Sequence, residues 1–463
     1  MTKQKKYNEC TKSAICKECP SNDMCQAWVN FVEKHSDTKP YVHFDKRVSL
    51  RMPSIRRYVL SSRNITTHSF YPFIHFQKKN SRFGKKGPKK PRELYYCSHL
   101  DRCVYQRYAF LINYYYNIWA KENGIDNIAI AYRDNLAKNN IDFAKAAFDA
   151  IKDFQKCFIF VGDFTNFFDN LNHQYLKRMI CKVLNMERLP DDYYAVLKNI
   201  TRFASWDWKD LVKAADENIL ERGIRTKLNQ KPTILTKKQF QDGKKFIKKN
   251  CSDVGVPQGS PISAVLSNVY MIEFDSALND FVSNNHGIYL RYSDDFIIIL
   301  PYEDNEKIDI FRNSITSFID SKNNLVDLQK EKTSCYVYNE SNLFHYPTWK
   351  ASSINYLGFL FDGKNIKIRP RAITKYYYRM RRKARTIGLS KGISSKGKRI
   401  SAKNLYSIYS KGGDKQTFID YAAKAKRELH LIDPEAEALI KRHKEKIALA
   451  IKRPRKRKGA KNT

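Results

Sequence analysis

Two apolar runs that flank a pair of acids predict a β-hairpin in the second half of the chain. The segment GIYLRY (287–292) precedes Ser-Asp-Asp, and FIIILP (296–301) follows it. Short apolar runs on either side of a tight turn are typical of antiparallel strands. The hairpin is therefore expected to carry Asp294 and Asp295 at its tip.

On its own, this acidic pair has an ordinary structural interpretation. Asp side chains in turns commonly accept hydrogen bonds from nearby backbone N–H groups while they face water. A Walker B carboxylate is a poor alternative, because such an acid follows its apolar strand, whereas Phe296–Leu300 comes after this pair. A functional role depends on a third acid elsewhere in the chain.

That third acid ends another apolar run. CFIFVGDF (157–164) reads as a buried strand that delivers Asp163 at its C-terminal end. Residues 142–154 and 171–185 read as amphipathic helices, because their apolar residues recur at the helical spacing. Between the acids, DVGVPQGSPISAVLSNVYM (253–271) reads as a Gly-Pro turn that leads into a helix.

An aromatic-rich segment and a Lys-rich segment complete the pattern. Residues 93–122 place aromatic and aliphatic side chains at helical spacing, and we interpret this stripe as core rather than as a base-stacking platform. Residues 205–250 are mixed and Lys-rich, which we interpret as an insertion or a mobile lobe.

The charge balance favours a polyanionic partner. The 463-residue chain has 85 Lys and Arg against 47 Asp and Glu, a formal net charge of +38, and its 42% hydrophobic residues indicate a globular protein. A surplus of this size favours nucleic-acid binding. A ribosomal or scaffold protein would share this bias, so charge identifies a class of partner and no activity.

Basic residues concentrate in three segments. They are residues 78–92, with eight Lys or Arg in fifteen, residues 367–385, with nine and no acid, and residues 452–461, with seven in ten. The first also contains two Pro and two Gly, which predicts a phosphate-facing loop. The last is expected to be a disordered tail that binds nucleic acid.

The cysteines indicate a reducing compartment and leave a metal site open. Ten cysteines without an export signal predict reduced thiols in a cytoplasmic protein, and no apolar run approaches the ~18 residues of a membrane span. Four cysteines cluster near the N-terminus: Cys10, Cys16, Cys19 and Cys25. They could hold Zn²⁺ or an iron–sulfur cluster, but their outer spacings do not match a standard zinc finger, so ordinary thiols are the alternative.

Three segments together resemble the motifs of bacterial reverse transcriptases, in family order. They are DFTNFFD (163–169), GVPQGSPISA (255–264) and YSDD (292–295). Four more segments look like family motifs: 89–105 and 130–140 like those of the fingers, QKEKTS (329–334) like a palm motif, and INYLGFLF (354–361) like the primer-grip hairpin. The resemblance covers roughly residues 75–380 and implies an RNA-directed DNA polymerase.

The resemblance implies an α+β fold of the right-hand polymerase type, with fingers, a palm that contains an antiparallel sheet, and a helical thumb. We expect a Cys-containing leader at 1–45, fingers at 46–150, a palm at 151–372 with an insertion around 205–250, and a thumb with a basic tail at 373–463.

The resemblance also implies the chemistry of the acids. Phosphoryl transfer from a dNTP uses two divalent ions about 4 Å apart, and carboxylate oxygens suit Mg²⁺. Asp163 and Asp294 are expected to bridge the ions, with Asp295 assisting and the Phe164 carbonyl completing the nucleotide-side ion. Lys332 matches the Lys that protonates the pyrophosphate leaving group.

Seven further positions match substrate-binding residues of the family: Lys90, Arg92, Arg133, Phe168 and Gln258 for the nucleotide, and Leu357 and Gly358 for the primer grip. Phe168 matches the bulky gate that excludes a ribose 2′-hydroxyl. The three cations resemble those that hold the triphosphate, for which Arg offers forked donors. Without the motifs, each cation would be interpreted as a surface charge.

Within the family, the chain is most like defence-associated reverse transcriptases. It shows no C-terminal Cys/His nuclease module, no Val-Thr-Gly motif typical of retrons, and a QGSPIS loop unlike that of diversity-generating enzymes. This implies a structured non-coding RNA template, dNTPs, a DNA product and a role against phage. The alternatives are a template-independent or protein-primed nucleotidyl transferase, a retron-like enzyme outside defence, and an inactive RNA-binding scaffold.

The basic tail yields a first prediction. Removal of residues 452–463 is expected to weaken RNA binding, and the slope of log K against log[salt] should fall by about 0.7–0.9 for each phosphate that is no longer neutralised. Fluorescence anisotropy titrations at several salt concentrations measure both quantities. Removal of the uncharged residues 462–463 alone is the control, and an unchanged slope for the longer deletion would contradict the prediction.

Overall fold

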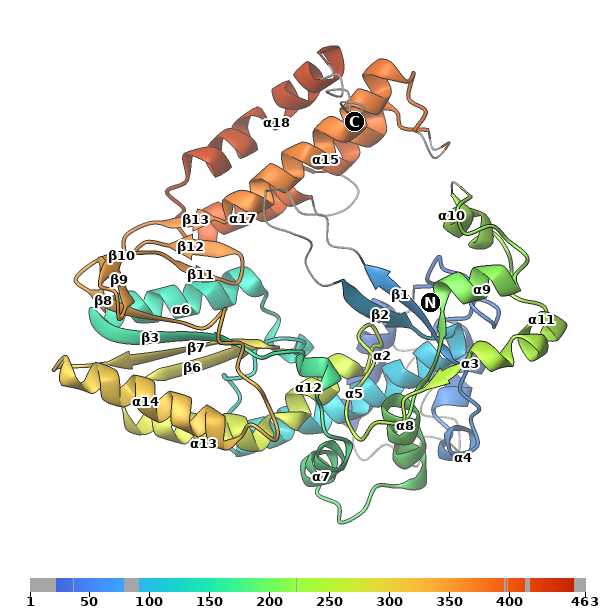
Figure 1. The fold of residues 1–463 in the computed structure, drawn as a ribbon, viewed down its shortest axis with the longest axis horizontal. Helices are drawn as coiled ribbons and strands as arrows, with labels where there is room; N and C mark the ends of the chain where they lie inside the picture. Colours follow the sequence, from blue (N-terminus) through green and yellow to red (C-terminus); the bar gives the residue numbers. More distant parts are fainter. Residues whose placement is uncertain are drawn as a thin grey trace, which may run out of the picture.

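The computed structural model describes residues 22–35, 37–78, 91–221, 223–394, 397, 399–412 and 417–453. Three sheets and the helices around them make up the described fold (Figure 1). A six-stranded sheet lies on the left of this view, a four-stranded sheet lies on the right, and long helices lie above both. Among the described helices, none has the length and apolar character needed to cross a membrane.

The six-stranded sheet is antiparallel throughout and is the centre of the fold. Its strands, in spatial order, are β10 (Lys350–Ala351), β9 (Asn342–Tyr346), β8 (Ser334–Asn339), β3 (Lys156–Asp163), β7 (Asp295–Pro301) and β6 (Ile288–Tyr292). The helices that cover it are α6 (Asn140–Phe154) on one face and α13 (Ile272–Asn284) and α14 (Glu306–Ser321) on the other. The predicted strand, hairpin and 142–154 helix are confirmed.

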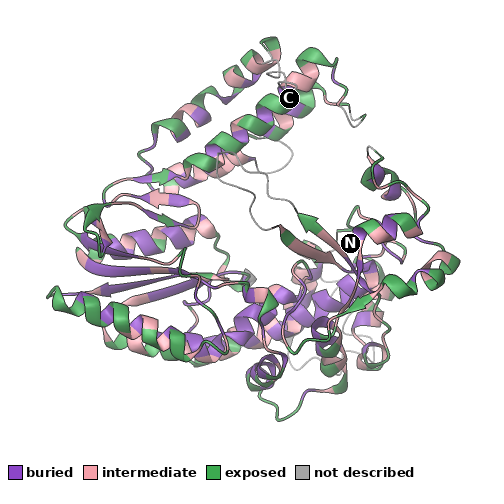
Figure 2. Cartoon of the chain, viewed as in Figure 1, coloured by how far each residue is buried: buried purple, intermediate pink, exposed green. Residues whose placement is uncertain are grey.

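Strands β3 and β7 are apolar on both faces because both faces are covered. Side chains alternate between the faces of a strand. Phe158 and Phe160 belong to the core that includes α13 and α14, whereas Cys157 and Ile159 belong to the core that includes α6. Figure 2 shows both strands as buried along most of their length. This double burial explains the uninterrupted apolar runs in the sequence.

The second sheet contains β2 (Arg92–Tyr96), β1 (Phe73–Lys78), β4 (Ala204–Asp207) and β5 (Lys248–Lys249), in that order. Trp206 is fully buried in a separate core with Phe44, Ile74 and Leu211. The Lys-rich segment 205–250 thus contributes to a sheet, because β4 and β5 extend the pairing of β1 and β2. Its apolar residues were too sparse to predict this pairing.

A long helix, α5 (His99–Glu122), joins the two sheets. Tyr105, Tyr108 and Tyr116 are each at most 2% exposed, which confirms that the aromatic stripe is core. Helices near it are α2 (Asn22–His35), α3 (Pro53–Val59), α7 (His173–Val183), α8 (Asp191–Thr201) and α12 (Ser263–Tyr270). Further from it are α4 (Ser62–Thr66), α9 (Trp208–Ala214), α10 (Ile224–Leu228) and α11 (Lys237–Asp242).

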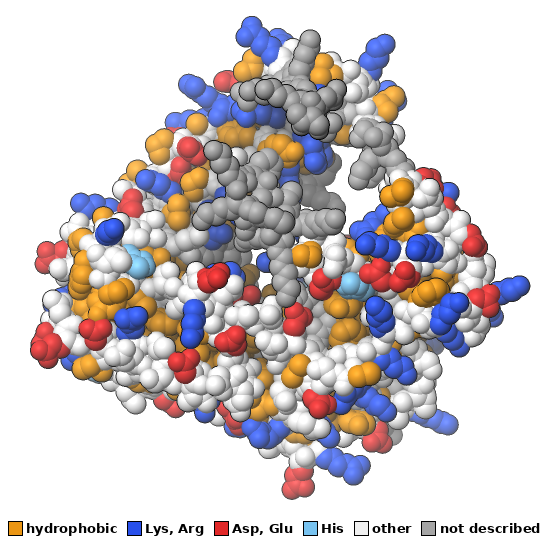
Figure 3. Space-filling view, viewed as in Figure 1, with side chains coloured by type: hydrophobic (Ala, Val, Ile, Leu, Met, Phe, Trp, Pro, Cys, Tyr) orange, Lys and Arg blue, Asp and Glu red, His pale blue; other side chains and the backbone are white. Residues whose placement is uncertain are grey.

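The C-terminal region is a small sheet followed by helices. Its elements are β11 (Ile354–Tyr356), β12 (Phe359–Phe361), β13 (Ile366–Ile368), α15 (Pro370–Leu389), α16 (Ala402–Tyr409), α17 (Phe418–Glu428) and α18 (Pro434–Lys452). Helix α15 buries Ile373, Tyr376, Met380 and Ala384, which recur at the helical spacing. Lys and Arg side chains remain on the surface of these helices at the top of Figure 3.

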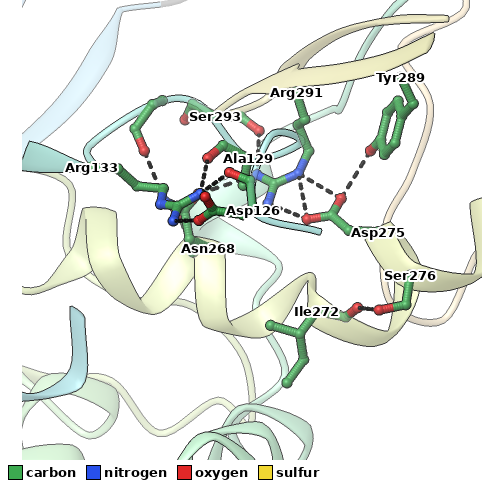
Figure 4. Close-up of polar contacts among 12 residues, drawn as sticks. Asp126, Ala129, Arg133, Asn268, Ile272, Asp275, Ser276, Tyr289, Arg291 and Ser293 are labelled. Carbon is green, nitrogen blue, oxygen red and sulfur yellow. Dashed lines mark hydrogen bonds and ion pairs between the residues drawn. The ribbon is translucent and has the colours of Figure 1, made fainter. Parts of the chain in front are cut away.

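A buried ion pair holds the β6–β7 hairpin against α13 (Figure 4). Arg291 and Asp275 have fully buried side chains, joined by hydrogen bonds of 2.8 Å from Nε and 2.6 Å from Nη2. Tyr289 donates to the same carboxylate at 2.9 Å, and Arg291 Nη1 donates to the Ser293 carbonyl at 3.0 Å. Arg291 therefore links the turn of the hairpin, through the Ser293 carbonyl, to Asp275 on α13.

The removal of one partner from this pair is expected to destabilise the fold. Asp275→Asn leaves the guanidinium buried without a counter-charge, so the free energy of unfolding should fall by about 3–5 kcal/mol. Urea denaturation measures the loss. Glu437→Gln makes the same chemical change in an exposed pair with Lys441 and should cost far less, because solvent screens the exposed pair. Equal losses for the two variants would contradict the prediction.

Candidate active site

The pairing of β3 with β7 brings the three predicted acids together. In the antiparallel register, Asp163 lies opposite Asp295. Asp294 occupies the preceding turn, and its carbonyl accepts a hydrogen bond of 3.1 Å from the N–H of Phe164. Ser293, also in this turn, has a φ of 63°, a left-handed conformation that is uncommon outside glycine. The turn thus fixes Asp294 against the end of β3.

The carboxylates lie in surroundings that disfavour negative charge. Burial raises the pKa of Asp163, the Lys332 ammonium acts in the opposite direction, and the charge of Asp294 raises it further. Asp295 keeps contact with solvent, yet partial desolvation by the surrounding protein, followed by the charges of Asp294 and Asp163, raises its pKa to about 6. The three acids therefore repel one another and lack full compensation.

Lys332 supplies positive charge to this group. Its Nζ forms an ion pair with Oδ2 of Asp163, and the N–H of Gln329 donates to the Asp163 carbonyl at 2.8 Å. The predicted palm Lys thus lies at the site. The other oxygen, Oδ1 of Asp163, is buried and has no hydrogen-bond partner among the described residues.

These features fit a divalent cation. Within the described residues, no group of three or more acidic, His or Cys side chains is positioned to hold a metal ion. However, the unpartnered oxygen and the raised carboxylate pKa values both indicate a deficit of positive charge. Carboxylates at such a place are the hard oxygen ligands that Mg²⁺ prefers.

Three of the predicted nucleotide-binding residues lie on β2, in the segment after β3 and in the PQG turn. The Arg92 charge acts on Asp163, so this exposed side chain at the start of β2 lies on its side of the site. Phe168 is half-buried against the core, and its carbonyl accepts from the N–H of Val256 at 2.9 Å. The Gln258 carbonyl accepts from the N–H of Tyr95 at 2.9 Å, which ties the PQG turn to β2.

Gly259 explains why this turn needs a glycine. Its φ is +119°, and a Cβ there would lie 2.3 Å from the carbonyl oxygen of Tyr95. Any larger residue would push the turn away from β2 and move Gln258 with it. Lys90, the remaining predicted fingers cation on this side, lies outside the described residues.

The structure contradicts the prediction that Arg133 holds a triphosphate. Its guanidinium is buried and donates to Asn117 Oδ1 at 2.8 Å, to the Ala129 carbonyl at 3.3 Å and to Asp126 (Figure 4). Its side chain is fully buried, and these structural partners take four of its five N–H donors, so it is not available to a substrate. The exposed neighbour is Tyr132, whose hydroxyl donates to Ser293 Oγ at 3.4 Å.

The predicted primer-grip segment forms a hairpin of β11 and β12. Leu357 and Gly358 make its turn, with φ values of 45° and 100°. Asn140 Nδ2 donates to the Leu357 carbonyl and to the Tyr421 hydroxyl, both at 2.9 Å. Tyr132 and Asn140 lie in the predicted fingers motif 130–140, although neither was singled out there. The sequence offered no signal for Tyr421, because only the fold brings it to Asn140.

The cysteine prediction stays open. Cys10, Cys16 and Cys19 lie outside the described residues, and Cys25 is buried in α2.

Comparisons with known proteins identify the family. The model of the family described as "Reverse transcriptase (RNA-dependent DNA polymerase)" matches residues 78–361. No curated protein matches the chain. Solved structures that are similar include telomerase from Candida albicans in complex with a fragment of telomeric RNA, at 11% identity over 92% of this chain and 69% of that chain, with a TM-score of 0.37. Apo telomerase from Candida tropicalis has 12% identity over 91% and 69%, with a TM-score of 0.39.

The sequence match decides the assignment, because it covers more than half of the chain and includes the β3 strand, the PQG turn and the YSDD hairpin. Around these elements the chain has the α+β architecture of a right-hand polymerase. The protein therefore belongs to the reverse transcriptase family of RNA-directed DNA polymerases.

Proposed function

We propose that this reverse transcriptase copies a dedicated, structured non-coding RNA in bacterial antiphage defence, with Asp163, Asp294 and Asp295 as the ligands of two Mg²⁺ ions. The observation that supports the site is the convergence of the end of β3 with the β6–β7 turn, where Asp163 faces Asp295. The defence role is supported by the sequence, which has no Val-Thr-Gly motif and a QGSPIS loop unlike that of diversity-generating enzymes.

In this proposal Asp163 and Asp294 would hold both ions, Asp295 would assist, and the Phe164 carbonyl would be a further ligand on the nucleotide side. Bound Mg²⁺ would activate the primer 3′-hydroxyl and neutralise the triphosphate. Lys332 holds a proton at Nζ beside Asp163 and transfers it to the departing pyrophosphate. In the free protein the same ammonium partly neutralises Asp163.

The remaining side chains select and hold the nucleotide. The charge of Arg92, on β2, acts on Asp163, and its forked donors would hold the triphosphate. The ring of Phe168 would fill the space that a ribose 2′-hydroxyl needs, beside the turn that carries Gln258. Lys90, which is predicted from the sequence alone, would be a second cation that binds the triphosphate. Leu357 and Gly358 support the primer end through their backbone.

The lobes follow from the three sheets. We assign β1, β2, β4 and β5 with their helices to the fingers, the six-stranded sheet to the palm, and α15–α18 to the thumb. The basic helices of the thumb would follow the backbone of an RNA–DNA duplex. Zinc or an iron–sulfur cluster at the N-terminal cysteines remains a proposal of the sequence alone.

Incubation of the purified protein with Mg²⁺ and labelled dNTPs tests the template, with and without RNase pretreatment. Labelled DNA that disappears after RNase supports an RNA template carried by the protein. DNA that survives RNase would contradict it and indicate template-independent synthesis, and label that stays on protein after phenol extraction would indicate a protein primer. Sequencing of the co-purified RNA identifies the template, and phage plating on cells that express the protein tests the defence role.

Asp294→Asn is expected to abolish DNA synthesis while folding and RNA binding persist. The lost ligand removes several kcal/mol of transition-state stabilisation, a factor of about a thousand or more in rate. Primer extension, thermal unfolding and RNA binding measure the three properties. Asp320→Asn, an exposed change on α14, is the matched control. Synthesis by the Asp294 variant within tenfold of the wild type would refute the metal assignment.

Phe168→Ala is expected to admit ribonucleotides. Loss of the ring opens the space for a 2′-hydroxyl, so the ratio of kcat/KM for dNTP over rNTP should fall by at least about tenfold. Single-nucleotide incorporation assays with both sugars give this ratio. Phe344→Ala truncates another half-buried ring, on β9, and should leave the ratio unchanged. Unaltered sugar discrimination by the Phe168 variant would show that the gate lies elsewhere.

A further inference from the structure

Arg369 occupies the junction between the primer-grip hairpin and the thumb. It follows β13 and directly precedes Pro370, the first residue of α15. Its backbone N–H donates to the Gly358 carbonyl at 3.0 Å. The residue is therefore fixed beside the Leu357–Gly358 turn by its own backbone, where β13 leads into α15 (Figure 1).

The guanidinium of Arg369 has no compensating partner in the described structure. Its Nε is buried without a hydrogen bond, and no ion pair joins its side chain to another described residue. Desolvation lowers the pKa of Arg369, while the charge of Asp295 raises it. Arg371, in the first turn of α15, adds positive charge, and that turn holds no acid. A half-buried cation without a partner is costly to the free protein.

The other two buried arginines near the site differ from Arg369 in this respect. Arg291 donates to Asp275 and Ser293, and Arg133 donates to Asn117, Asp126 and Ala129. Their donors are used by the fold itself. The fold leaves the donors of Arg369 free, although it positions the residue through a backbone hydrogen bond.

Two cations thus flank the acidic group on different sides. The charge of Arg92 acts on Asp163 from the side of β2, and the charge of Arg369 acts on Asp295 from the side of the β11–β12 turn. The β2 side is where the nucleotide is proposed to bind. An anion bound by Arg369 would therefore belong to the strand that rests on the turn.

We propose that Arg369 binds a phosphodiester of the primer strand, next to its 3′ end. This inference rests on the proposed function of Leu357 and Gly358 as the primer grip. The forked donors of an arginine match two phosphate oxygens, and a phosphate returns the counter-charge that the free protein lacks. In this arrangement the Arg369 guanidinium would hold the phosphate next to the terminal nucleotide of the primer. The 3′-hydroxyl of that nucleotide would then lie at the carboxylates.

A charge-neutral linkage tests the contact directly. Primers on one RNA template carry a single methylphosphonate at one of the last three linkages, and Kd is measured without dNTP for the wild type, Arg369→Gln and Arg369→Lys. One linkage should weaken wild-type binding by roughly tenfold or more, the usual effect of removing a hydrogen bond to a charged group. Arg369→Gln should bind the unmodified primer more weakly than the wild type by the same factor. The methylphosphonate at that linkage should not weaken its binding further.

Controls separate this contact from a structural effect. Lys367→Gln removes a cation two residues earlier, which pairs with Asp362 at 3.8 Å, and should keep the full sensitivity to the methylphosphonate. Arg369→Lys keeps the charge without the fork and should show part of that sensitivity, with a Tm within the error of the wild type.

Three results would overturn the inference. The first is a methylphosphonate effect of equal size in the wild type and in Arg369→Gln, at every linkage. The second is sensitivity to a neutral linkage in the template instead of the primer. The third is a raised KM for dNTP with an unchanged Kd for the duplex, which would assign Arg369 to the triphosphate. Wild-type protein that extends no nucleic-acid primer would refute the primer-grip assignment itself.

Discussion

The register of β3 against β7 is the constraint on which the site depends. It forces two carboxylates, Asp163 and Asp295, to face each other at the end of a sheet, and the turn adds Asp294 beside them. Three like charges in this position oppose folding. The sheet tolerates them because its two central strands bury apolar side chains on both faces, and this burial stabilises the pairing that places the acids together.

The positive charges around the acids divide into two groups according to their hydrogen bonds. Arg291 and Arg133 are buried, donate hydrogen bonds to groups of the fold itself, and hold the hairpin and the 126–133 loop in place. Arg92 and Arg369 face the acids from two sides without an ion-pair partner in the described structure, and Lys332 contacts Asp163 directly. Arg291 and Arg133 thus stabilise the frame of the site, whereas the side chains of the two arginines proposed to bind substrate make no hydrogen bond or ion pair within the described fold.

The pattern of apolar, polar and turn residues within short segments was sufficient to predict the helices and strands that form the site. The apolar runs of β3 and β7, the helical spacing of α6 and α5 and the turn residues around Asp294 are all properties of short segments. Arg133 was misassigned because a motif gives the position of a side chain along the chain and not its direction, and here the donors point to Asn117 and Ala129. The place of the 205–250 segment in the second sheet could not be predicted, because the pairing of β4 with β1 joins strands more than a hundred residues apart. Arg369 lies in none of the family motifs, and only the structure singles it out, because its Nε is buried without a hydrogen-bond partner.

The central claim is that the three carboxylates form one divalent-metal centre. Crystals of the protein grown with Mn²⁺ in place of Mg²⁺, with an RNA–DNA duplex and a non-reactive dNTP analogue, allow the ions to be located by anomalous diffraction. The account predicts two peaks about 4 Å apart, in contact with Asp163 and Asp294, and Lys332 displaced from Asp163. An anomalous map with no peak at the hairpin tip, while duplex and nucleotide are bound, would contradict it.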